Sequence, residues 1–367
     1  MIKKNFIQTI DWCTLSIISI LSVCSLLFIY SSTNTVEIPY SIFLQKQIFG
    51  IITGYILFFT FFISDHRTLS RVAYFTYYIV ILLLIYTLIK GKIGMGAQRW
   101  IDLKLFRFQP SEVAKLFFPG FFSFFLFTEK DVPLYSFDTF IPLLGILAGS
   151  SLLILKQPDL GTAIVFGASG LFLLWCAGIG KKFFQYGLLC AILSAPLLWT
   201  YGLKPYQKQR VLVFLGAGSL LKERYHIEQS KIAIGSGGLW GKGFKQGTQN
   251  QFDFLPESRT DFIFSVMCEE LGFVKILIII LLYIILFLRL LYKIYNVPFF
   301  FAQLQALGLL LPIMLSACIN IGMVCGLLPI VGIPLPFISY GITATWIHFS
   351  ALGWIENITQ HEFVGLP

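Results

Sequence analysis

The sequence predicts an all-α, polytopic membrane protein with about ten transmembrane helices and a large extracytoplasmic loop. Three observations predict this class. The 367 residues are 57% hydrophobic and only 12% charged, with a mean hydropathy of +0.80. Ten apolar runs approach or exceed the length that crosses a bilayer, which is about 17–25 residues. One long polar stretch, residues 201–262, interrupts these runs between the seventh and the eighth.

Turn-forming residues separate the ten runs, and several of the runs are near the short limit for a span. No internal repeat and no low-complexity segment divides the chain, so residues 1–367 form one integral membrane domain. The first run is too long for the apolar part of a signal peptide and lacks a small-residue cleavage site after it. In chain order the runs are 13–30, 47–63, 73–90, 111–127, 139–155, 162–179, 183–200, 272–292, 300–325 and 337–355.

The distribution of basic residues gives a conflicting signal about orientation. Lys3 and Lys4 precede the first run and favour a cytoplasmic N-terminus. An even number of spans then puts both termini in the cytoplasm and residues 201–262 outside. The short connection 90–110 would also lie outside, although it is rich in cations. Either this orientation is wrong, or these cations bind an anionic ligand on the outer face. They are Lys90, Lys92, Arg99, Lys104 and Arg107.

Charge and composition narrow the classes of ligand. The net charge of +9 favours anionic headgroups or an anionic lipid-linked substrate over nucleic acid, because no basic helix stands clear of the spans. Six of the seven cysteines lie in apolar runs and the four histidines are scattered, which argues against a His/Cys metal site. The glycine run that starts at Gly235 fits neither nucleotide-binding motif, since Trp240 and Gly243 occupy required positions. No organic cofactor is expected.

The segment GAQRWIDLKLFRFQPSEVAK, Gly96 to Lys115, carries the first group of candidate residues. Pro110 suits the first position of a helix, and Glu112 complements the positive end of the helix dipole. Lys115 follows Glu112 by three residues, so the two can form an ion pair on one face. One hypothesis is a capped helix start with an ion pair. The other adds Arg99 and Arg107 as a cradle for phosphate, with Trp100 at the membrane interface.

The connection KQPDLGTA, Lys156 to Ala163, carries a second candidate, Asp159. Its carboxylate can cap the following helix by accepting backbone N–H bonds. It can instead face an outer cavity and hold a cation or a sugar hydroxyl.

The polar stretch ends in LPESRTDFIF, Leu255 to Phe264. Leu255-Pro256 breaks the chain, and we expect a helix to resume near residues 258–260. This puts Asp261 in the first helical turn, close to the membrane boundary. Glu269, eight residues later, would then lie within about 80° of the same helix face. Asp261 is either a catalytic carboxylate or only an acid favoured by the helix dipole.

The apolar segment GLLPIVGIPLPFISYG, Gly326 to Gly341, contains three prolines between the last two runs. Irregular backbone at membrane depth occurs where it is buried in protein or lines a cavity. The segment either walls a groove for a lipid tail or is a tight apolar connector.

These segments together resemble the SEDS family (shape, elongation, division and sporulation proteins) of membrane glycosyltransferases. The motifs GAQRW, RFQPSE, QPDLGTA, GSGGLWGKGFKQGTQ, FLPESRTDFIF, EELG and PFISYG occur in the family's order along the whole chain. The stretch GKGFKQGTQNQFDFLPE resembles the elongation (RodA-like) branch more than the division branch. The resemblance implies ten spans, cytoplasmic termini in the inner membrane, and an outer active site. It also implies polymerisation of lipid II for cell elongation and shape, with a class B penicillin-binding protein as transpeptidase partner.

The resemblance also implies roles for residues. Asp261 matches the proposed catalytic aspartate, and Glu112, Lys115, Arg107 and Asp159 match the family's polar outer cavity. In this hypothesis Asp261 takes the proton from the acceptor sugar's 4-OH. Other residues contact the substrate or hold its pyrophosphate, and a divalent cation, Mg²⁺ or Mn²⁺, could be bound by Asp261 or Asp159. The substrate-contacting residues are Arg99, Arg107, Glu112, Lys115, Asp159, Lys231 or Arg210, and Glu257.

Two other functions share these features. A transporter, such as a lipid II flippase, would also have the spans, the outer cations and the proline-broken segment. Ion-coupled transporters place ionisable residues near the middle of the bilayer, whereas here the middles of the runs are almost free of charge. A non-enzymatic scaffold for cell-wall proteins would not need Asp261.

Overall fold

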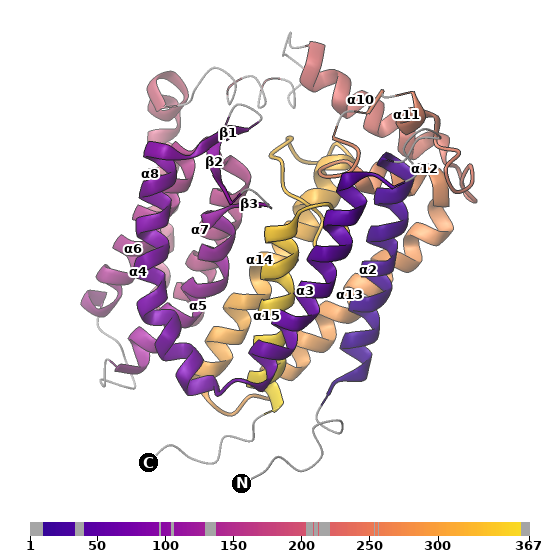
Figure 1. The fold of residues 1–367 in the computed structure, drawn as a ribbon. Coiled ribbons are helices and arrows are strands. Elements are labelled where there is room, and N and C mark those ends of the chain that lie inside the picture. The colour runs from indigo at the N-terminus through magenta and orange to yellow at the C-terminus, as the bar shows by residue number, and fades with distance from the viewer. Residues whose placement is uncertain are drawn as a thin grey trace.

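The structure is a computed structural model of a helical bundle. It describes residues 10–33, 40–94, 97–103, 106–128, 137–202, 208, 212, 221–252, 254–255 and 257–360. The long helices run along a common direction, and the described chain begins and ends at one end of the bundle (Figure 1). We call this the termini end, and the opposite end, which carries α10 to α12 and the strands, the loop end. Lys3, Lys4, Lys104, Arg210 and Pro256 lie outside the described residues.

The described residues contain ten long helices that correspond to the ten predicted runs. Six of them, α2, α3, α4, α6, α13 and α14, are long and apolar enough to cross a membrane. The chain is thus a multi-pass membrane protein. The ten helices are α2 (Trp12–Thr33), α3 (Ile42–Ile63), α4 (His66–Lys90), α5 (Pro110–Thr128), α6 (Phe137–Lys156), α7 (Leu160–Cys176), α8 (Lys181–Leu197), α13 (Phe273–Tyr295), α14 (Phe300–Val324) and α15 (Ile342–Gln360).

Several helix ends differ from the predicted runs by three or more residues; the second and third helices, for example, begin at Ile42 and His66 rather than at residues 47 and 73. The last helix begins at Ile342 rather than at residue 337. The stretch before it cannot be helical, because Leu335 N and Tyr340 N donate to Ser339 Oγ and Arg259 O rather than to a preceding helical turn. The seventh helix ends at Leu197 and continues as a π-helical turn, η1 (Leu198–Gly202).

The expectation of an all-α chain is wrong for the connection 90–110. Three short strands, β1 (Lys92–Gly94), β2 (Ala97–Asp102) and β3 (Arg107–Phe108), form an antiparallel sheet in the order β1-β2-β3. A connection of this length can satisfy its backbone groups by folding back on itself, which the sheet accomplishes. Lys92 forms an ion pair with Asp102 across the sheet.

Close contacts between backbone and aromatic rings hold α3 against α15. A methyl group at Gly54 would lie 2.9 Å from the Phe349 ring, and one at Gly353 would lie 2.2 Å from Phe58 O. Small residues allow such close approach between helices in a membrane. Near the termini end, Asn357 donates to Phe62 O (2.6 Å) and Ser64 O (2.7 Å) and ties α15 to the end of α3.

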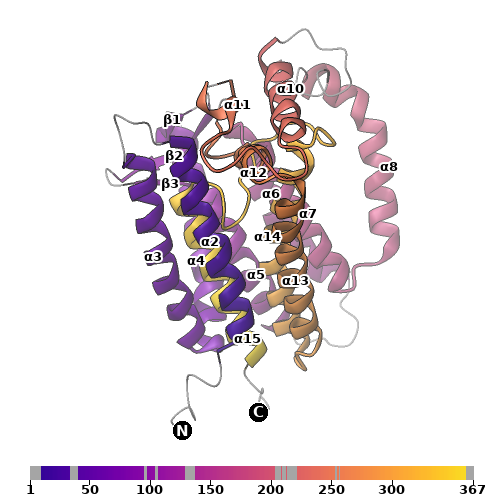
Figure 2. The same cartoon turned by 90° about the vertical axis from the view of Figure 1, so that its right-hand side faces the viewer.

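Helix α8 lies apart from the other long helices (Figure 2). Its described side chains are exposed or half-buried, which fits a helix that lipid surrounds on most sides. Helices α10 (Leu221–Ser236), α11 (Thr248–Gln251) and α12 (Ile263–Leu271) lie at the loop end. The polar stretch 201–262 therefore contains helices in its described part.

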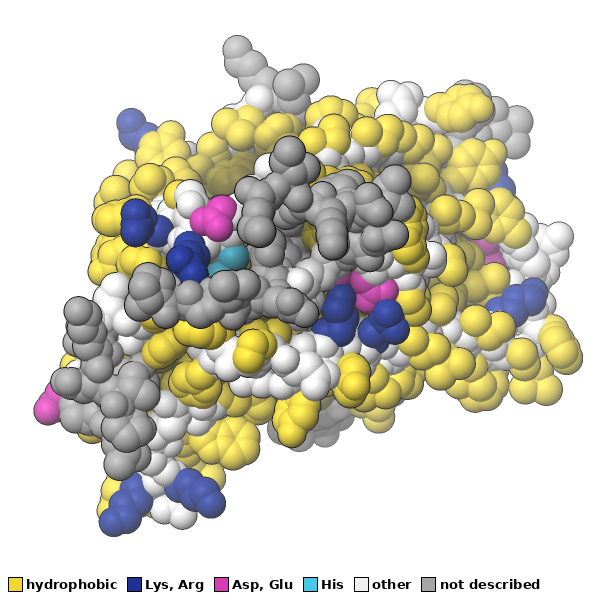
Figure 3. Space-filling view, turned by 90° about the horizontal axis from the view of Figure 1, so that it is seen from below, with side chains coloured by type: hydrophobic (Ala, Val, Ile, Leu, Met, Phe, Trp, Pro, Cys, Tyr) yellow, Lys and Arg dark blue, Asp and Glu magenta, His cyan; other side chains and the backbone are white. Residues whose placement is uncertain are grey.

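The termini end carries a charge cluster. Arg289 donates two hydrogen bonds of 2.8 Å to Asp11, and Lys293 contacts Asp11 at 3.2 Å and Glu356 at 2.6 Å. Burial opposes the charge on Asp11, but these cations outweigh it and hold its pKa well below the usual range. Figure 3 shows this end, with Lys and Arg side chains at several places on a largely hydrophobic surface.

Candidate active site

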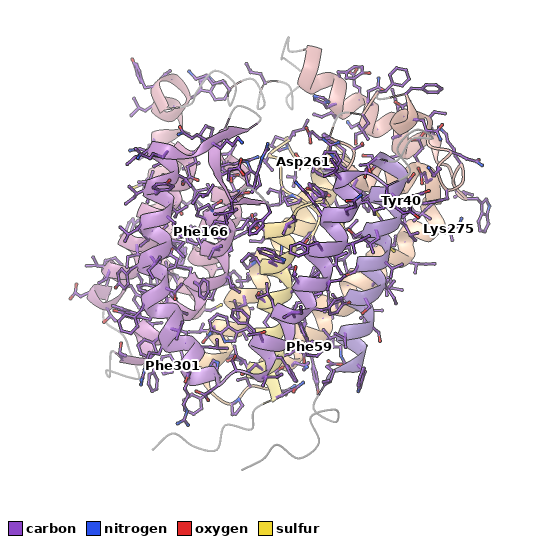
Figure 4. The ribbon with its side chains drawn as sticks, viewed as in Figure 1. Tyr40, Phe59, Phe166, Asp261, Lys275 and Phe301 are labelled. Carbon is purple, nitrogen blue, oxygen red and sulfur yellow. The ribbon has the colours of Figure 1, made fainter. Side chains whose placement is uncertain are left out.

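Asp261 lies in a turn, not in a helix. The turn is closed by Glu257, whose backbone is left-handed (φ 54°) and whose carbonyl accepts from Thr260 N (3.1 Å) and Phe262 N (3.3 Å). The helix does not start at 258–260 as predicted, because these bonds reach back three and five residues instead of the four of an α-helix, and α12 begins at Ile263. Figure 4 shows Asp261 toward the loop end, far from the labelled Phe59 and Phe301 near the termini end.

One buried amide fixes the backbone of this turn. Asn320 Nδ2 donates to Asp261 O (2.9 Å) and to Ile333 O (2.7 Å), so it links the turn to the proline-containing segment. A methyl group at Gly332 would lie 3.4 Å from Asp261 Oδ2, which places the carboxylate directly against that segment. The Asp261 side chain is half-buried. Asn320 was not among the predicted site residues.

The motifs LPESRTDF and PFISYG meet through their backbones. Ser339 Oγ donates to Thr260 O (2.6 Å) and accepts from Leu335 N (2.8 Å), while Tyr340 N donates to Arg259 O (3.0 Å). These bonds satisfy irregular backbone that lies within the protein, as membrane depth requires. Segment 326–341 is therefore one wall of the Asp261 environment. Whether a lipid tail also lies against it stays a prediction.

Asp159 caps α7, as one of the two hypotheses predicted. Its Oδ1 accepts from Thr162 N (3.3 Å) and lies 3.2 Å from Arg99 Nη1, and its Oδ2 accepts from Gln109 Nε2 (2.7 Å). The residue is 1% exposed. Protein donors therefore occupy both carboxylate oxygens.

Helix α7 begins on the other side of the same wall. A methyl group at Gly161 would lie 2.6 Å from Val331 O, next to Gly332. The start of α7, two residues after Asp159, and the Asp261 carboxylate thus both lie against residues 331–333.

Glu112 and Lys115 form the predicted ion pair at the start of α5. Pro110 is the first residue of this helix, as expected. Lys115 Nζ lies 2.7 Å from Glu112 Oε1, and each side chain is 6% exposed. Glu112 Oε2 is buried with no partner among the described residues. The pair is therefore more deeply enclosed than a solvent-lined cradle for phosphate would be.

The side chains of the other predicted cations are more exposed to solvent than Glu112 and Lys115. Arg107 is exposed on β3, and its carbonyl accepts from Thr343 Oγ1 (2.9 Å). Arg99 stacks near Trp100 at 5.7 Å, in addition to its pairing with Asp159. Lys231 is exposed on α10, and a methyl group at Gly326 would lie 2.6 Å from its amine.

Glu269 does not share a face with Asp261. The geometric argument assumed one continuous helix, but Asp261 precedes α12. Glu269 is 0% exposed and lies 2.6 Å from Lys242 Nζ. It also accepts from Thr248 Oγ1 (3.0 Å) and Gln249 N (3.3 Å), so it organises the glycine-rich loop.

Of the two carboxylates that could bind a divalent cation, Asp261 suits it better than Asp159. Among the described residues there is no group of three or more His, Cys, Asp or Glu that could hold a metal. Asp159 is a poor ligand because its oxygens already accept hydrogen bonds. Asp261 suits Mg²⁺ or Mn²⁺ better, since Mg²⁺ often binds one or two carboxylates and completes its shell with phosphate oxygens and water.

Comparison with known proteins agrees with this architecture. The family model FtsW/RodA/SpoVE, described as cell cycle protein, matches residues 6–363. Peptidoglycan glycosyltransferase MrdB of Escherichia coli K12 is 43% identical over 289 residues, 78% of each chain. MrdB of Helicobacter pylori J99 is 31% identical over 348 residues, 94% of this chain and 88% of the relative.

Two solved structures share the fold. A chain from a study titled "Structural coordination of polymerization and crosslinking by a peptidoglycan synthase complex" superposes with a TM-score of 0.82 at 24% identity, covering 97% of this chain and 99% of that one. The crystal structure of the rod shape determining protein RodA of Thermus thermophilus gives 0.73 at 23% identity, covering 99% and 100%.

Proposed function

This chain belongs to the FtsW/RodA/SpoVE family, and from that premise we propose that it polymerises lipid II into glycan strands with Asp261 as the general base. It is a peptidoglycan glycosyltransferase of the elongation type, like the MrdB and RodA relatives. The observation that carries the residue assignment is the position of Asp261. Its half-buried carboxylate lies at the loop end, against a backbone wall built from two irregular segments.

The proposed reaction is a direct displacement at an anomeric carbon. Asp261 accepts the proton of the 4-OH of the acceptor sugar as that oxygen attacks the anomeric carbon of the donor. The bond from the anomeric carbon to the diphosphate breaks, and the diphosphate leaves as an anion on its lipid. One displacement inverts the configuration at carbon, and one carboxylate suffices because the leaving group needs no proton.

Cations at the loop end support this chemistry. Arg107 is exposed beside the wall that contacts Asp261, so it can stabilise the charge on the departing diphosphate. Arg99 is oriented by Asp159, and Lys231 is exposed on α10. The pair Glu112–Lys115 is enclosed beneath them, and Glu257 shapes the turn of Asp261. When bound, Mg²⁺ or Mn²⁺ would add positive charge at the diphosphate, with Asp261 as its protein ligand.

The membrane arrangement is part of the proposal. All ten long helices span the inner membrane, both termini lie in the cytoplasm, and the loop end with residues 201–262 faces outward. The chain is one integral membrane domain. Figure 1 supports this, since the described chain begins and ends at one end of the bundle and α10 to α12 lie at the other. The partner we propose is a class B penicillin-binding protein, in keeping with the solved synthase complex that has this fold.

The test uses purified protein, with and without the transpeptidase partner, incubated with labelled lipid II and analysed on gels for polymer. We expect Asp261→Asn to lower polymer formation by roughly 10²–10⁴-fold, because it removes the base but keeps the shape. Asp138→Asn, an exposed acid at the start of α6, is the control and should leave the rate unchanged.

Near wild-type polymerisation by Asp261→Asn would show that Asp261 is not the base. If wild-type protein makes no polymer with its partner but moves labelled lipid II between the leaflets of vesicles, the chain is a lipid II flippase instead.

A further inference from the structure

Arg259, two residues before Asp261, was not among the predicted site residues. We propose that Arg259 is a substrate-binding residue whose guanidinium, together with that of Arg107, holds the phosphate groups of a lipid-linked diphosphate beside Asp261. This inference rests on the proposed function and adds a binding residue to it.

The backbone carbonyls of both arginines accept hydrogen bonds from one short stretch of chain, residues 340–343. Tyr340 N donates to Arg259 O (3.0 Å), and Thr343 Oγ1 donates to Arg107 O (2.9 Å). Gly341 N, within the same four-residue stretch, donates to Gln47 Oε1 (3.2 Å) on α3. The stretch 340–343 therefore brings together the turn before α12 and the strand β3, which are far apart in the sequence.

The side chain of Arg259 is oriented by aromatic rings. Its Cζ lies 3.9 Å from the centroid of the Phe43 ring, and Phe43 packs edge-on against Tyr340 at 5.4 Å. A guanidinium stacked on a ring keeps its N–H groups free along its edge, where they can bind a phosphate in bidentate fashion. The residue is half-buried, so the rings hold it in place while one side remains accessible.

Arg259 and Arg107 both affect the pKa of one group, the hydroxyl of Tyr340. Burial raises the pKa of its hydroxyl, whereas the nearby Arg259 and Arg107 lower it in part. The fields of the two guanidinium groups thus overlap at this phenol.

Neither cation is neutralised within the described part of the chain. Four other cations of the loop end have carboxylate partners: Lys92 with Asp102, Arg99 with Asp159, Lys115 with Glu112, and Lys242 with Glu269. Arg107 and Arg259 form no such pair with the described residues. Two unpaired guanidinium groups repel each other, and an anion with two phosphates relieves that repulsion. The diphosphate leaves from the same anomeric carbon that the acceptor oxygen attacks, so the groups that hold it belong to the same site as the general base, and Arg259 shares the turn of Asp261.

The test measures lipid II affinity and melting temperature on the same samples in nanodiscs of zwitterionic lipid. We expect Arg259→Gln to weaken lipid II binding by roughly ten- to a hundredfold, the typical effect of losing one charge-assisted contact. Arg259→Lys keeps the charge but not the bidentate fork. It should bind lipid II about threefold to tenfold more weakly than wild type, a smaller loss than that of Arg259→Gln. Arg71→Gln, an exposed cation at the termini end, is the matched control and should bind as wild type does.

A second variant separates charge from packing. Phe43→Leu removes the stacked ring but leaves the cation, so we expect most of the affinity to remain. Equal loss of affinity in Arg259→Gln, Arg259→Lys and Phe43→Leu, with equal loss of melting temperature, would mean that Arg259 only packs, and would overturn the proposal. Unchanged affinity in Arg259→Gln would overturn it as well.

The source of the phosphate is tested by competition. Inorganic pyrophosphate should compete with lipid II for wild-type protein and compete less well for Arg259→Gln. If nanodiscs that contain phosphatidylglycerol abolish this difference, the site binds bilayer phospholipid and the substrate assignment is wrong. If wild-type protein binds lipid II but forms no polymer, the proposed function is wrong. The binding role of Arg259 is then still decided by the lipid II affinities of its variants.

Discussion

Asn320 donates one hydrogen bond to Asp261 O and a second to Ile333 O, so one amide of α14 fixes the backbone of the candidate base. The residue is 0% exposed. A polar side chain at this depth is expensive unless its hydrogen bonds are made, and both N–H groups of this amide are used. The arrangement couples the position of Asp261 to the proline-containing segment on its other side.

We expect Asn320→Ala to lower kcat for lipid II polymerisation by roughly ten- to a hundredfold with little change in KM. Small displacements of a catalytic group are enough for such losses. Asn357→Ala is a matched control, because Asn357 also bridges two carbonyls with its amide but does so near the termini end. Both variants should lose stability by about 1–3 kcal/mol. Equal losses of kcat in the two variants would show that Asn320 does not position the base.

Arg107 and Lys115 should respond differently to neutralisation. Arg107 is exposed and has no carboxylate partner among the described residues, so Arg107→Gln should weaken lipid II binding about ten- to a hundredfold at unchanged melting temperature. Lys115→Gln leaves Glu112 buried and unpaired, so it should cost about 3–5 kcal/mol of stability. Thermal melting and lipid II affinity on the same samples distinguish these outcomes.

The double variant Glu112→Gln/Lys115→Met provides the control for the buried pair. The double variant has no buried, unpaired charge at residue 112. It should therefore recover much of the stability that Lys115→Gln alone loses. A double variant as unstable as Lys115→Gln alone would show that the loss comes from packing.

The neighbouring acids Glu269 and Glu270 should have opposite effects on stability. Glu269→Gln breaks the contact with Lys242 and should lower the free energy of unfolding by about 1–3 kcal/mol. Burial raises the pKa of Glu270, opposed in part by the hydrogen bond from Ser31, so folding disfavours the charged form of its carboxyl relative to the unfolded chain. Glu270→Gln should therefore raise the melting temperature at pH 7.

The same raised pKa sets a sign for the pH dependence. The contribution of Glu270 to stability is fully present below the pKa of the unfolded chain and is lost as the pH rises through the higher folded pKa. The stabilising effect of Glu270→Gln should thus shrink as the pH falls toward acid values. An effect that is independent of pH would contradict the assignment of a raised pKa.

Orientation can be tested by labelling single cysteines in a variant that lacks the seven native ones. Gln246→Cys lies exposed at the loop end, and Arg67→Cys lies exposed at the start of α4 near the termini end. An impermeant thiol reagent added to intact cells should label the first and leave the second unlabelled until the membrane is permeabilised. The reverse pattern would put the candidate site in the cytoplasm.

Patterns in the sequence predict the helical architecture and several local features of the site. Apolar runs have to form helices in a membrane, because a helix satisfies its own backbone groups. The helix start at Pro110 and the i,i+3 pair of Glu112 and Lys115 depend on neighbours in the chain, and both are confirmed. The cap by Asp159 is also local, and it was one of two hypotheses for that residue.

Long-range packing sets which segments of the site lie side by side, and it can be read only from the three-dimensional structure. Asn320 and Arg259 gave only weak signals, a single amide in an apolar run and a cation beside an acid, because their roles depend on partners far away in the sequence. The Asp261–Glu269 geometry was predicted wrongly because Asp261 lies in the turn that precedes α12, so the helical periodicity of α12 does not include it. The wall between Asp159 and Asp261 exists because residues 331–333 pack between α7 and the turn before α12, and no local rule encodes that contact.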